Sequence, residues 1–275
     1  MDVFYQLNPQ TLPQRKSTKE AAHDIPILIA IMGPTGGGKS NFIKLATGSD
    51  IEVGHSLHSC TMSIREVACL HPHKNYEIRF VDTPGFDPTS HENLEVLNDI
   101  ARWLAQKYQG GVKLSGVIYT HRITDNRVSN SALTTLDLFQ KICGANAFPN
   151  IRLVTTHWDD VRGDTHEYEK RETELCNVFW SALMERGSKT LRFHNSMTSA
   201  WDIIDSLPLD RRTLQIQQEM VDQNLSLEET TAGRTFAWFW DVVNSLRSIM
   251  ERIGLALRGT RMSEDGSASL RRFES

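Results

Sequence analysis

The chain has 275 residues, of which 39% are hydrophobic and 23% are charged, and 30 basic against 34 acidic residues give a formal net charge of −4. These values lie near globular averages and disfavour wholesale disorder, a collagen-like repeat and a disulfide scaffold. The negative balance offers no electrostatic footprint for nucleic acid. The four cysteines form no C-x-x-C pair, and no stretch has the roughly 18 uncharged apolar residues of a membrane span. We therefore expect a cytoplasmic protein.

Residues 1–24 are polar and lack a sustained apolar period, so we expect a flexible leader. The continuous apolar run 27–32 is typical of a strand that is buried on both faces. Further strands are predicted at 76–81, 116–120, 151–155 and 190–193, an antiparallel one within 61–70, and helices at 41–46, 92–109, 130–142 and 168–185. This alternation predicts an α/β domain over residues 25–209, with three layers and a mostly parallel sheet.

After residue 209 the pattern is helical only, which predicts a helical C-terminal extension over 210–258 and a disordered tail over 259–275. A helix is expected at 214–223, and Ser226 with Glu229 forms a capping box for another. That second helix is amphipathic, with Trp238 beside a stripe made of Phe236, Phe239 or Trp240, Val243, Leu246, Met250, Ile253 and Leu257. The stripe could pack on the domain, bind a membrane surface or pair with a partner helix. Binding to a membrane surface would make this a peripheral membrane protein.

The strongest motif is a G-x-x-x-x-G-K-S loop directly after the first buried strand. Glycines at these positions let backbone N–H groups surround phosphate oxygens, and the following helix N-terminus adds partial positive charge. The motif predicts a phosphate-binding loop in which the lysine reaches the β- and γ-phosphates and the serine ligates Mg²⁺. Its residues are Gly33, Pro34, Thr35, Gly36, Gly37, Gly38, Lys39 and Ser40.

Two further motifs follow strands. Asp82 begins a D-x-x-G turn, where the carboxylate suits Mg²⁺ and Gly85 can bring its backbone N–H against the γ-phosphate. The strand 151–155 ends in Thr156, His157, Trp158 and Asp159, a variant of the Asn/Thr-Lys-x-Asp pattern that accepts hydrogen bonds from guanine N1 and its amino group. His157 stands where lysine is usual, and Asp160 is an alternative carboxylate.

The order GPTGGGKS, DTPGF, TTHWD and a late strand ending in RFHN resembles a translation-factor-class GTPase over about residues 25–207. Within that class the chain resembles the septin-related branch with the GIMAP and Toc GTPases. Segments 46–50, 54–57, 59–61 and 118–123 are similar to fungal G-domain proteins of that branch. The resemblance implies a P-loop NTPase G domain that binds GTP or GDP with Mg²⁺.

The resemblance also implies site residues. Thr61 is the best match to the switch threonine that coordinates Mg²⁺, with Ser59 as runner-up, and together with Lys39 it would act in hydrolysis. His194 and Asn195 would lie near the guanine, with Asn195 preferred because its amide both donates and accepts. Ser199 and Ala200 are an alternative for that last loop.

One departure bears on mechanism: Phe86 follows the D-x-x-G turn, where Ras-like proteins have a water-positioning glutamine nearby. Unassisted hydrolysis should then be slow. The resemblance suggests a homodimer through the nucleotide face, with the loop of His121, Arg122 and Asp125 as a contact. Arg122 could act on the nucleotide of the partner copy; the alternative is that it is a solvated or structural arginine.

The sequence thus predicts a GTP-binding switch whose slow hydrolysis is stimulated by dimerisation or a partner. The alternative is a GTP-dependent dimerising scaffold with negligible hydrolysis. A P-loop ATPase or kinase is disfavoured by residues 156–159. Cys60, Cys69, His71 and His73 match no zinc spacing, so we expect no metal there.

Overall fold

The computed structural model describes residues 27–49, 64–85, 92–238, 241 and 244–245. Six strands form one sheet in the order β2-β3-β1-β4-β5-β6. The strands are β1 (Ile27–Met32), β2 (Arg65–Leu70), β3 (Glu77–Asp82), β4 (Gly116–Arg122), β5 (Ile151–Thr156) and β6 (Lys189–Arg192). All neighbours are parallel except β2 and β3, which run antiparallel. The predicted α/β fold with a mostly parallel sheet is confirmed.

The register brings the three motifs to one edge of the sheet. Strand β1 lies between β3 and β4, with Ile31 opposite Asp82 and Met32 opposite Tyr119. Strand β5 ends beside β4, with Thr156 opposite Arg122. Because parallel strands point the same way, the segments that follow them emerge together at the carboxyl edge, which is where ligands bind in open α/β sheets.

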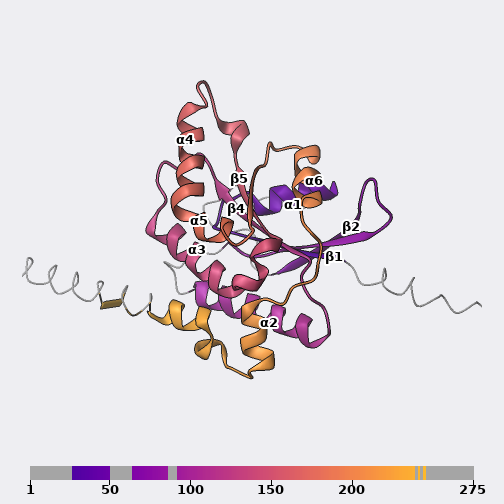
Figure 1. The fold of residues 1–275 in the computed structure, drawn as a ribbon, viewed down its shortest axis with the longest axis vertical. Coiled ribbons are helices and arrows are strands. Elements are labelled where there is room, and N and C mark those ends of the chain that lie inside the picture. Colours follow the sequence, from indigo (N-terminus) through magenta and orange to yellow (C-terminus); the bar gives the residue numbers. More distant parts are fainter. Residues whose placement is uncertain (1–26, 50–63, 86–91, 239–240, 242–243, 246–275) are drawn as a thin grey trace, which may run out of the picture.

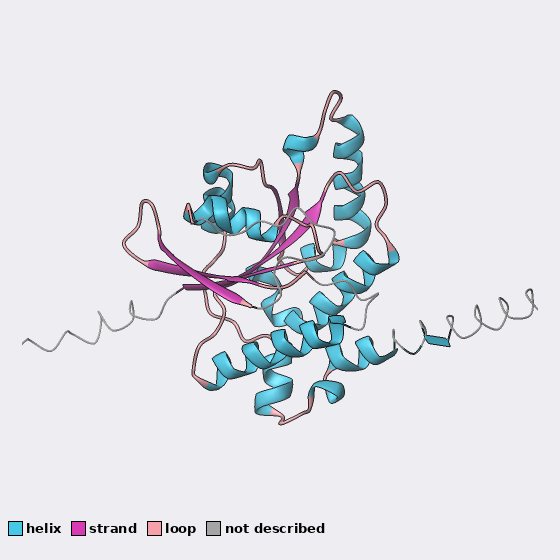
Figure 2. Ribbon diagram, turned by 180° about the vertical axis from the view of Figure 1, so that it is seen from behind, coloured by secondary structure: helices cyan, strands magenta, loops and turns pink. Residues whose placement is uncertain are grey.

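Helices cover both faces of the sheet (Figures 1 and 2). On one face, α1 (Lys39–Thr47) and α6 (Met197–Asp205) pack on β1, β3 and β4 in a core that includes Phe42, Phe80 and Trp201. On the other, α2 (Glu92–Gln109) and α3 (Asn130–Cys143) form a larger core with residues such as Leu97 and Phe139. Alternate residues of each central strand enter opposite cores, as the doubly buried strands require.

The helix predicted over 168–185 is interrupted. It consists of α4 (His166–Glu174), a wider π turn over 175–179, and α5 (Ser181–Met184). The Trp180 backbone N–H donates to the Leu175 carbonyl at 2.8 Å, a five-residue spacing. Leu175, Trp180 and Leu183 are all buried, at intervals of five and three residues that a regular α-helix would not keep on one face. Burial of these side chains therefore accounts for the break.

Helix α6 was not predicted. Its N-cap is Ser196, whose hydroxyl accepts from the Ser199 backbone N–H at 3.2 Å. Its buried face includes Ala200, Ile203 and Ile204. The signal was present, because a capping serine followed by apolar residues at this spacing marks a helix.

The C-terminal part is helical, as expected. It begins with α7 (Gln215–Gln217) and continues as a π turn over 218–222, a 3₁₀ turn over 227–229 and a helix over 231–238, and residues 241 and 244–245 are also helical. The predicted capping box is present, since the Ser226 N–H donates to Glu229 at 2.9 Å. In Figure 1 this part lies beside α2.

The C-terminal part shares the core of α2 and α3. Leu214, Ile216, Leu227, Ala232 and Phe236 all belong to that core. Phe236, the first residue of the predicted stripe, is 1% exposed, whereas Trp238 is 67% exposed. The extension thus packs on the domain at least as far as Phe236.

Several predicted features lie outside the described residues: the leader, the tail, Ser59, Cys60, Thr61, Phe86, and the stripe positions 239, 240, 242–243 and 246–257. Within the part of the chain that the structure describes, no helix is both long and apolar enough to cross a lipid bilayer.

Candidate nucleotide site

The phosphate loop has the backbone that its glycines allow. Gly33, Gly36 and Gly38 have φ angles of +140°, +76° and +84°, which L side chains avoid. A Cβ at Gly33 would also lie 2.5 Å from the Thr120 carbonyl oxygen on β4. The loop can therefore curl closely over the sheet edge only with glycine at these positions.

Lys39 starts α1 with its side chain under this loop. It is 6% exposed, and its Nζ donates to the carbonyl oxygens of Gly33 at 3.0 Å and Pro34 at 2.9 Å. Burial lowers the pKa of Lys39 to about 8, against a smaller opposing effect of the Asp82 carboxylate. A cation desolvated in this way gains strongly from phosphate oxygens that approach it.

Ser40 and Asp82 supply the oxygen ligands that Mg²⁺ prefers. The Ser40 hydroxyl, in the first turn of α1, donates to Asp82 Oδ2 at 2.8 Å, and Asp82 is 1% exposed at the end of β3. A hydroxyl and a carboxylate from adjacent elements fit a hard divalent cation beside the phosphate loop. These two residues would hold the ion; Thr61 lies outside the described residues.

The D-x-x-G turn touches the phosphate loop. A Cβ on Gly85 would lie 2.3 Å from Thr35 Oγ1 and 2.6 Å from Thr35 Cα, so no larger residue fits there. Thr83 anchors the turn, since its hydroxyl donates to the Ile31 carbonyl at 2.8 Å. The Gly85 backbone is therefore held against the loop that would carry the phosphates.

The loop after β5 is joined to the phosphate loop at two points. The Thr156 hydroxyl donates to the Gly37 carbonyl at 3.1 Å. His157 has φ +62°, in the left-handed region, and its Nε2 lies 3.1 Å from the Gly36 carbonyl oxygen. His157 Nδ1 lies 2.8 Å from Asp160 Oδ2. His157 thus bridges the two loops rather than standing free at the surface.

The two neighbouring carboxylates face different partners. Asp159 Oδ2 accepts a hydrogen bond from Asn195 Nδ2 at 2.6 Å, whereas Asp160 Oδ2 contacts His157 Nδ1. Asn195 Oδ1 in turn accepts from Asn41 Nδ2 at 2.7 Å, which links the loop after β6 to α1. Asp159 and Asn195 therefore come together beside the phosphate loop, as two members of one hydrogen-bonded chain.

Asn41 was missed by the sequence analysis, and its only signal is its place directly after Lys39 and Ser40. The alternative pair, Ser199 and Ala200, is buried in the first turn of α6. There the Ser199 hydroxyl accepts from the His194 backbone N–H at 3.1 Å.

A second group of residues, also missed, holds the loop after β5 from behind. Trp158 Nε1 donates to Thr155 Oγ1 at 2.9 Å, and the Arg192 guanidinium lies 4.2 Å from the Trp158 ring centroid. Arg192 donates to Glu172 Oε2 from both Nε, at 2.8 Å, and a terminal nitrogen, at 2.5 Å. These contacts join β5, β6 and α4, and no local sequence pattern announces them.

Three candidate residues lie at the end of β4 and differ in exposure: His121 and Arg122 are the last two residues of the strand, and Asp125 lies in the loop that follows. His121 is 6% exposed, and burial lowers its pKa. Arg122 and Asp125 are exposed, and Arg122 Nε donates to the Thr124 hydroxyl at 2.8 Å. Arg122 and Asp125 are thus the two of these three residues that another chain could reach.

The suggested metal-capable group has a structural role where it is described. His71 Nε2 lies 2.9 Å from Asp205 Oδ1, and His71 Nδ1 accepts from the His73 backbone N–H at 3.0 Å. These bonds tie the β2–β3 turn to α6. Among the described residues, no three His, Cys, Asp or Glu side chains gather where a metal ion could sit.

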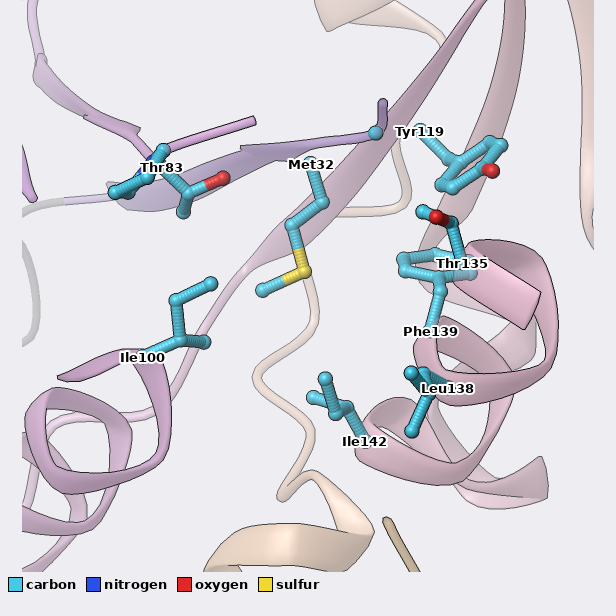
Figure 3. Close-up of a pocket in the computed structure, with 10 residues that line it drawn as sticks. Met32, Thr83, Ile100, Tyr119, Thr135, Leu138, Phe139 and Ile142 are labelled. Atoms are coloured by element: carbon cyan, nitrogen blue, oxygen red, sulfur yellow. The ribbon is translucent and has the colours of Figure 1, made fainter. Parts of the chain in front are cut away.

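An apolar pocket of about 20 Å³ lies behind the phosphate loop, between α2 and α3 (Figure 3). Met32 stands between Ile100 of α2 and the α3 residues Leu138 and Phe139 in this view. The pocket also borders Gly33 and Thr83. Its apolar lining and small size do not suit a nucleotide, so it is separate from the polar site described above.

Comparison with known proteins finds a family match and solved structures of similar fold. Residues 28–118 match the model of the 50S ribosome-binding GTPase family. No curated protein matches the chain. Similar solved structures include Toc33 from Arabidopsis thaliana with GDP and Mg²⁺, at TM-score 0.56 and 15% identity, covering 72% of this chain and 90% of Toc33.

Two further structures of chloroplast proteins are similar. The Arabidopsis thaliana Toc33 complex with Mg²⁺ and GMPPNP has a TM-score of 0.50 and 19% identity over 65% of this chain and 75% of Toc33. Another structure has a TM-score of 0.51 and 16% identity, and the match covers 65% of this chain and 74% of that one. It is described with the finding that dimerisation is important for the GTPase activity of the chloroplast translocon components atToc33 and psToc159. The sheet and these similarities show that the described chain has the α/β fold of a P-loop G domain, with a helical C-terminal part.

Proposed function

We propose that this protein binds GTP and GDP with Mg²⁺ and acts as a nucleotide-dependent switch. One observation carries the proposal: Asp159 and Asn195 are hydrogen-bonded to each other beside the phosphate loop. Thr156 and His157, which precede Asp159, contact carbonyl oxygens of that loop. A guanine-accepting carboxylate and a phosphate cradle are then parts of one site.

The roles follow from the chemistry of each group. Residues 33–40 hold the phosphates through backbone N–H groups and the Lys39 ammonium. Ser40, Asp82 and Thr61 would hold Mg²⁺, and the ion would then supply positive charge beside the β- and γ-phosphates. Asp159 accepts from guanine N1 and its amino group, Asn195 orients Asp159, and His157 and Thr156 support the base. Gly85 contacts the γ-phosphate through its N–H.

Hydrolysis consists of attack by water on the γ-phosphorus, which releases GDP and phosphate. Phe86 cannot orient a water molecule, so we propose slow intrinsic turnover. Lys39 and Thr61 stabilise the charge that develops on the γ-phosphate oxygens. Faster turnover requires a group from a second copy or another partner.

A homodimer through the nucleotide face would supply such a group, and exposed Arg122 at the end of β4 is available for it. The importance of dimerisation for the Toc33 GTPase, a protein of similar fold, supports this idea. The alternative is a scaffold that binds GTP, pairs and hardly hydrolyses it. We also propose a cytoplasmic location, with residues beyond 238 contacting a membrane surface or a partner helix.

The direct test is competition against a fluorescent GDP analogue in the presence of Mg²⁺. GTP and GDP should displace it at least about a hundredfold better than ATP, because adenine leaves the Asp159 carboxylate unpaired. Removing Mg²⁺ with a chelator should weaken GTP binding. Equal displacement by ATP would sink the assignment to guanine nucleotides.

A further inference from the structure

His157 makes two side-chain contacts that both require it to donate. Nε2 faces the Gly36 carbonyl oxygen at 3.1 Å, and a carbonyl oxygen only accepts. Nδ1 faces Asp160 Oδ2 at 2.8 Å, and an ionised carboxylate also only accepts. A neutral imidazole carries one N–H and satisfies one of these contacts. Both together need the doubly protonated imidazolium.

The backbone at this position supports a specific role. His157 has φ +62°, a conformation that non-glycine residues adopt at an energetic cost unless the surroundings hold them there. The neighbouring Thr156 hydroxyl bonds Gly37 of the same phosphate loop, so the His157 contact is the second of two adjacent fastenings. Asp160 has a side chain that is 52% exposed, and it approaches the imidazole from the solvent side of the turn.

We infer that Asp160 is a positioning residue, which holds His157 as an imidazolium on the Gly36 carbonyl oxygen. The loop after β5, here called the base-reading loop, is thereby attached to the phosphate loop in a proton-dependent way; this attachment is called the latch below. The part that concerns GTP rests on the proposed function. The protonation of His157 does not, because both of its contacts are with groups of the chain itself.

The consequence has a definite sign. A neutral imidazole carries one N–H, so His157 keeps only one of its two contacts when it loses a proton. The base-reading loop is then held less firmly, and GTP affinity falls. Other titratable groups on adjoining segments are Asp159 in the same turn, Lys39 in the phosphate loop and His194 beside Asn195. Their contributions must be subtracted.

The first experiment observes the imidazole nitrogens of the nucleotide-free protein by long-range ¹H–¹⁵N NMR between pH 5 and 8.5. The spectrum of His157→Gln identifies the His157 signals among those of the ten histidines. Asp160→Asn removes the carboxylate charge and should lower the imidazolium fraction at a given pH, by about two- to fivefold in the protonation constant. Asp159→Asn, the neighbouring control, should change it less. An imidazole titration that is the same in Asp160→Asn and wild type would overturn the inference.

The second experiment measures GTP affinity across the same pH range. His157→Gln keeps an amide donor for Gly36 but does not titrate, so its affinity should fall less with pH than that of the wild type, by about two- to fivefold over the range. Titration of Lys39 and of the GTP phosphate is common to both proteins and cancels. Identical profiles would overturn the latch while leaving GTP binding intact. Failure of the wild type to bind GTP would instead overturn the proposed function, and the NMR result would still judge the protonation of His157.

Discussion

Lys39 is buried, and its Nζ donates to two carbonyl oxygens of the phosphate loop, those of Gly33 and Pro34. Its cost of desolvation is expressed in the pKa, which falls to about 8. Phosphate oxygens would offset that cost, because charge-assisted hydrogen bonds in a partly dry site are stronger than neutral ones. The nucleotide is thus expected to complete the environment of this side chain.

Replacing Lys39 by alanine should weaken Mg²⁺–GTP binding by about 2 to 4 kcal/mol, because the charge-assisted bonds to the phosphates are lost. Isothermal titration calorimetry on the two proteins gives the difference. The matched control is Lys74→Ala, which removes an exposed lysine from the turn between β2 and β3. If Lys39→Ala binds as tightly as the control, the phosphate site has been assigned to the wrong loop.

Asp159 and Asp160 are adjacent in sequence but have different partners, Asn195 and His157. Asp159→Asn should erode the preference for guanine and favour xanthine, whose 2-oxo group can receive a hydrogen bond from the new amide. Binding of GTP and XTP to both variants provides the measurement. Asp160→Asn should retain the preference for GTP. Exchange of specificity in Asp160→Asn, and none in Asp159→Asn, would mean that the carboxylates have the opposite roles.

At the scale of elements, the C-terminal helix joins the fold through one side and leaves the other in solvent. Ala232 and Phe236 enter the core between α2 and α3, and Gln217 of α7 donates to the Leu104 carbonyl at 3.0 Å. Glu219 fastens the start of the helix, since it accepts from the Thr231 backbone N–H at 2.9 Å. The extension is therefore held by both apolar burial and buried polar contacts.

Phe236→Ala should lower the free energy of unfolding by about 3 to 5 kcal/mol, since it empties a buried aromatic site. Trp238→Ala, two residues further along the same helix, should change it by less than about 0.5 kcal/mol because the indole is exposed. Urea denaturation followed by circular dichroism compares the two variants. Equal destabilisation would show that this helix is packed differently. GTP affinity should change little in Trp238→Ala, since the proposed site lies elsewhere.

At the scale of the whole molecule, both ends of the nucleotide site open at the carboxyl edge of the sheet, where a second copy could also meet it. If pairing stimulates turnover, single-turnover GTP hydrolysis per molecule should rise with protein concentration. Arg122→Ala should reduce the rate at high concentration without changing GTP affinity. Arg127→Ala serves as the control, because Arg127 is an exposed arginine in the loop that follows β4. A low rate that is independent of concentration would favour the scaffold alternative.

Local sequence patterns were sufficient to predict the sheet, the glycine-rich loop over residues 33–40 and the D-x-x-G turn. These features depend on local rules: an apolar run specifies a buried strand, and glycines at 33, 36 and 38 permit a backbone that other residues avoid. A helix with a clear cap and period, such as α3, follows from the same rules. Such signals need no knowledge of distant contacts.

The packing of the folded chain determines which carboxylate contacts Asn195, that Asn41 extends this hydrogen-bonded chain, and that Arg192 and Glu172 support Trp158. It also decided that Phe236 belongs to the core of the domain. Each of these contacts joins residues far apart in the chain, and their partners are selected by the packing of strands and helices. Side chains such as Asp159 and Asp160 have equal local propensities, so only the surroundings of the folded chain separate them.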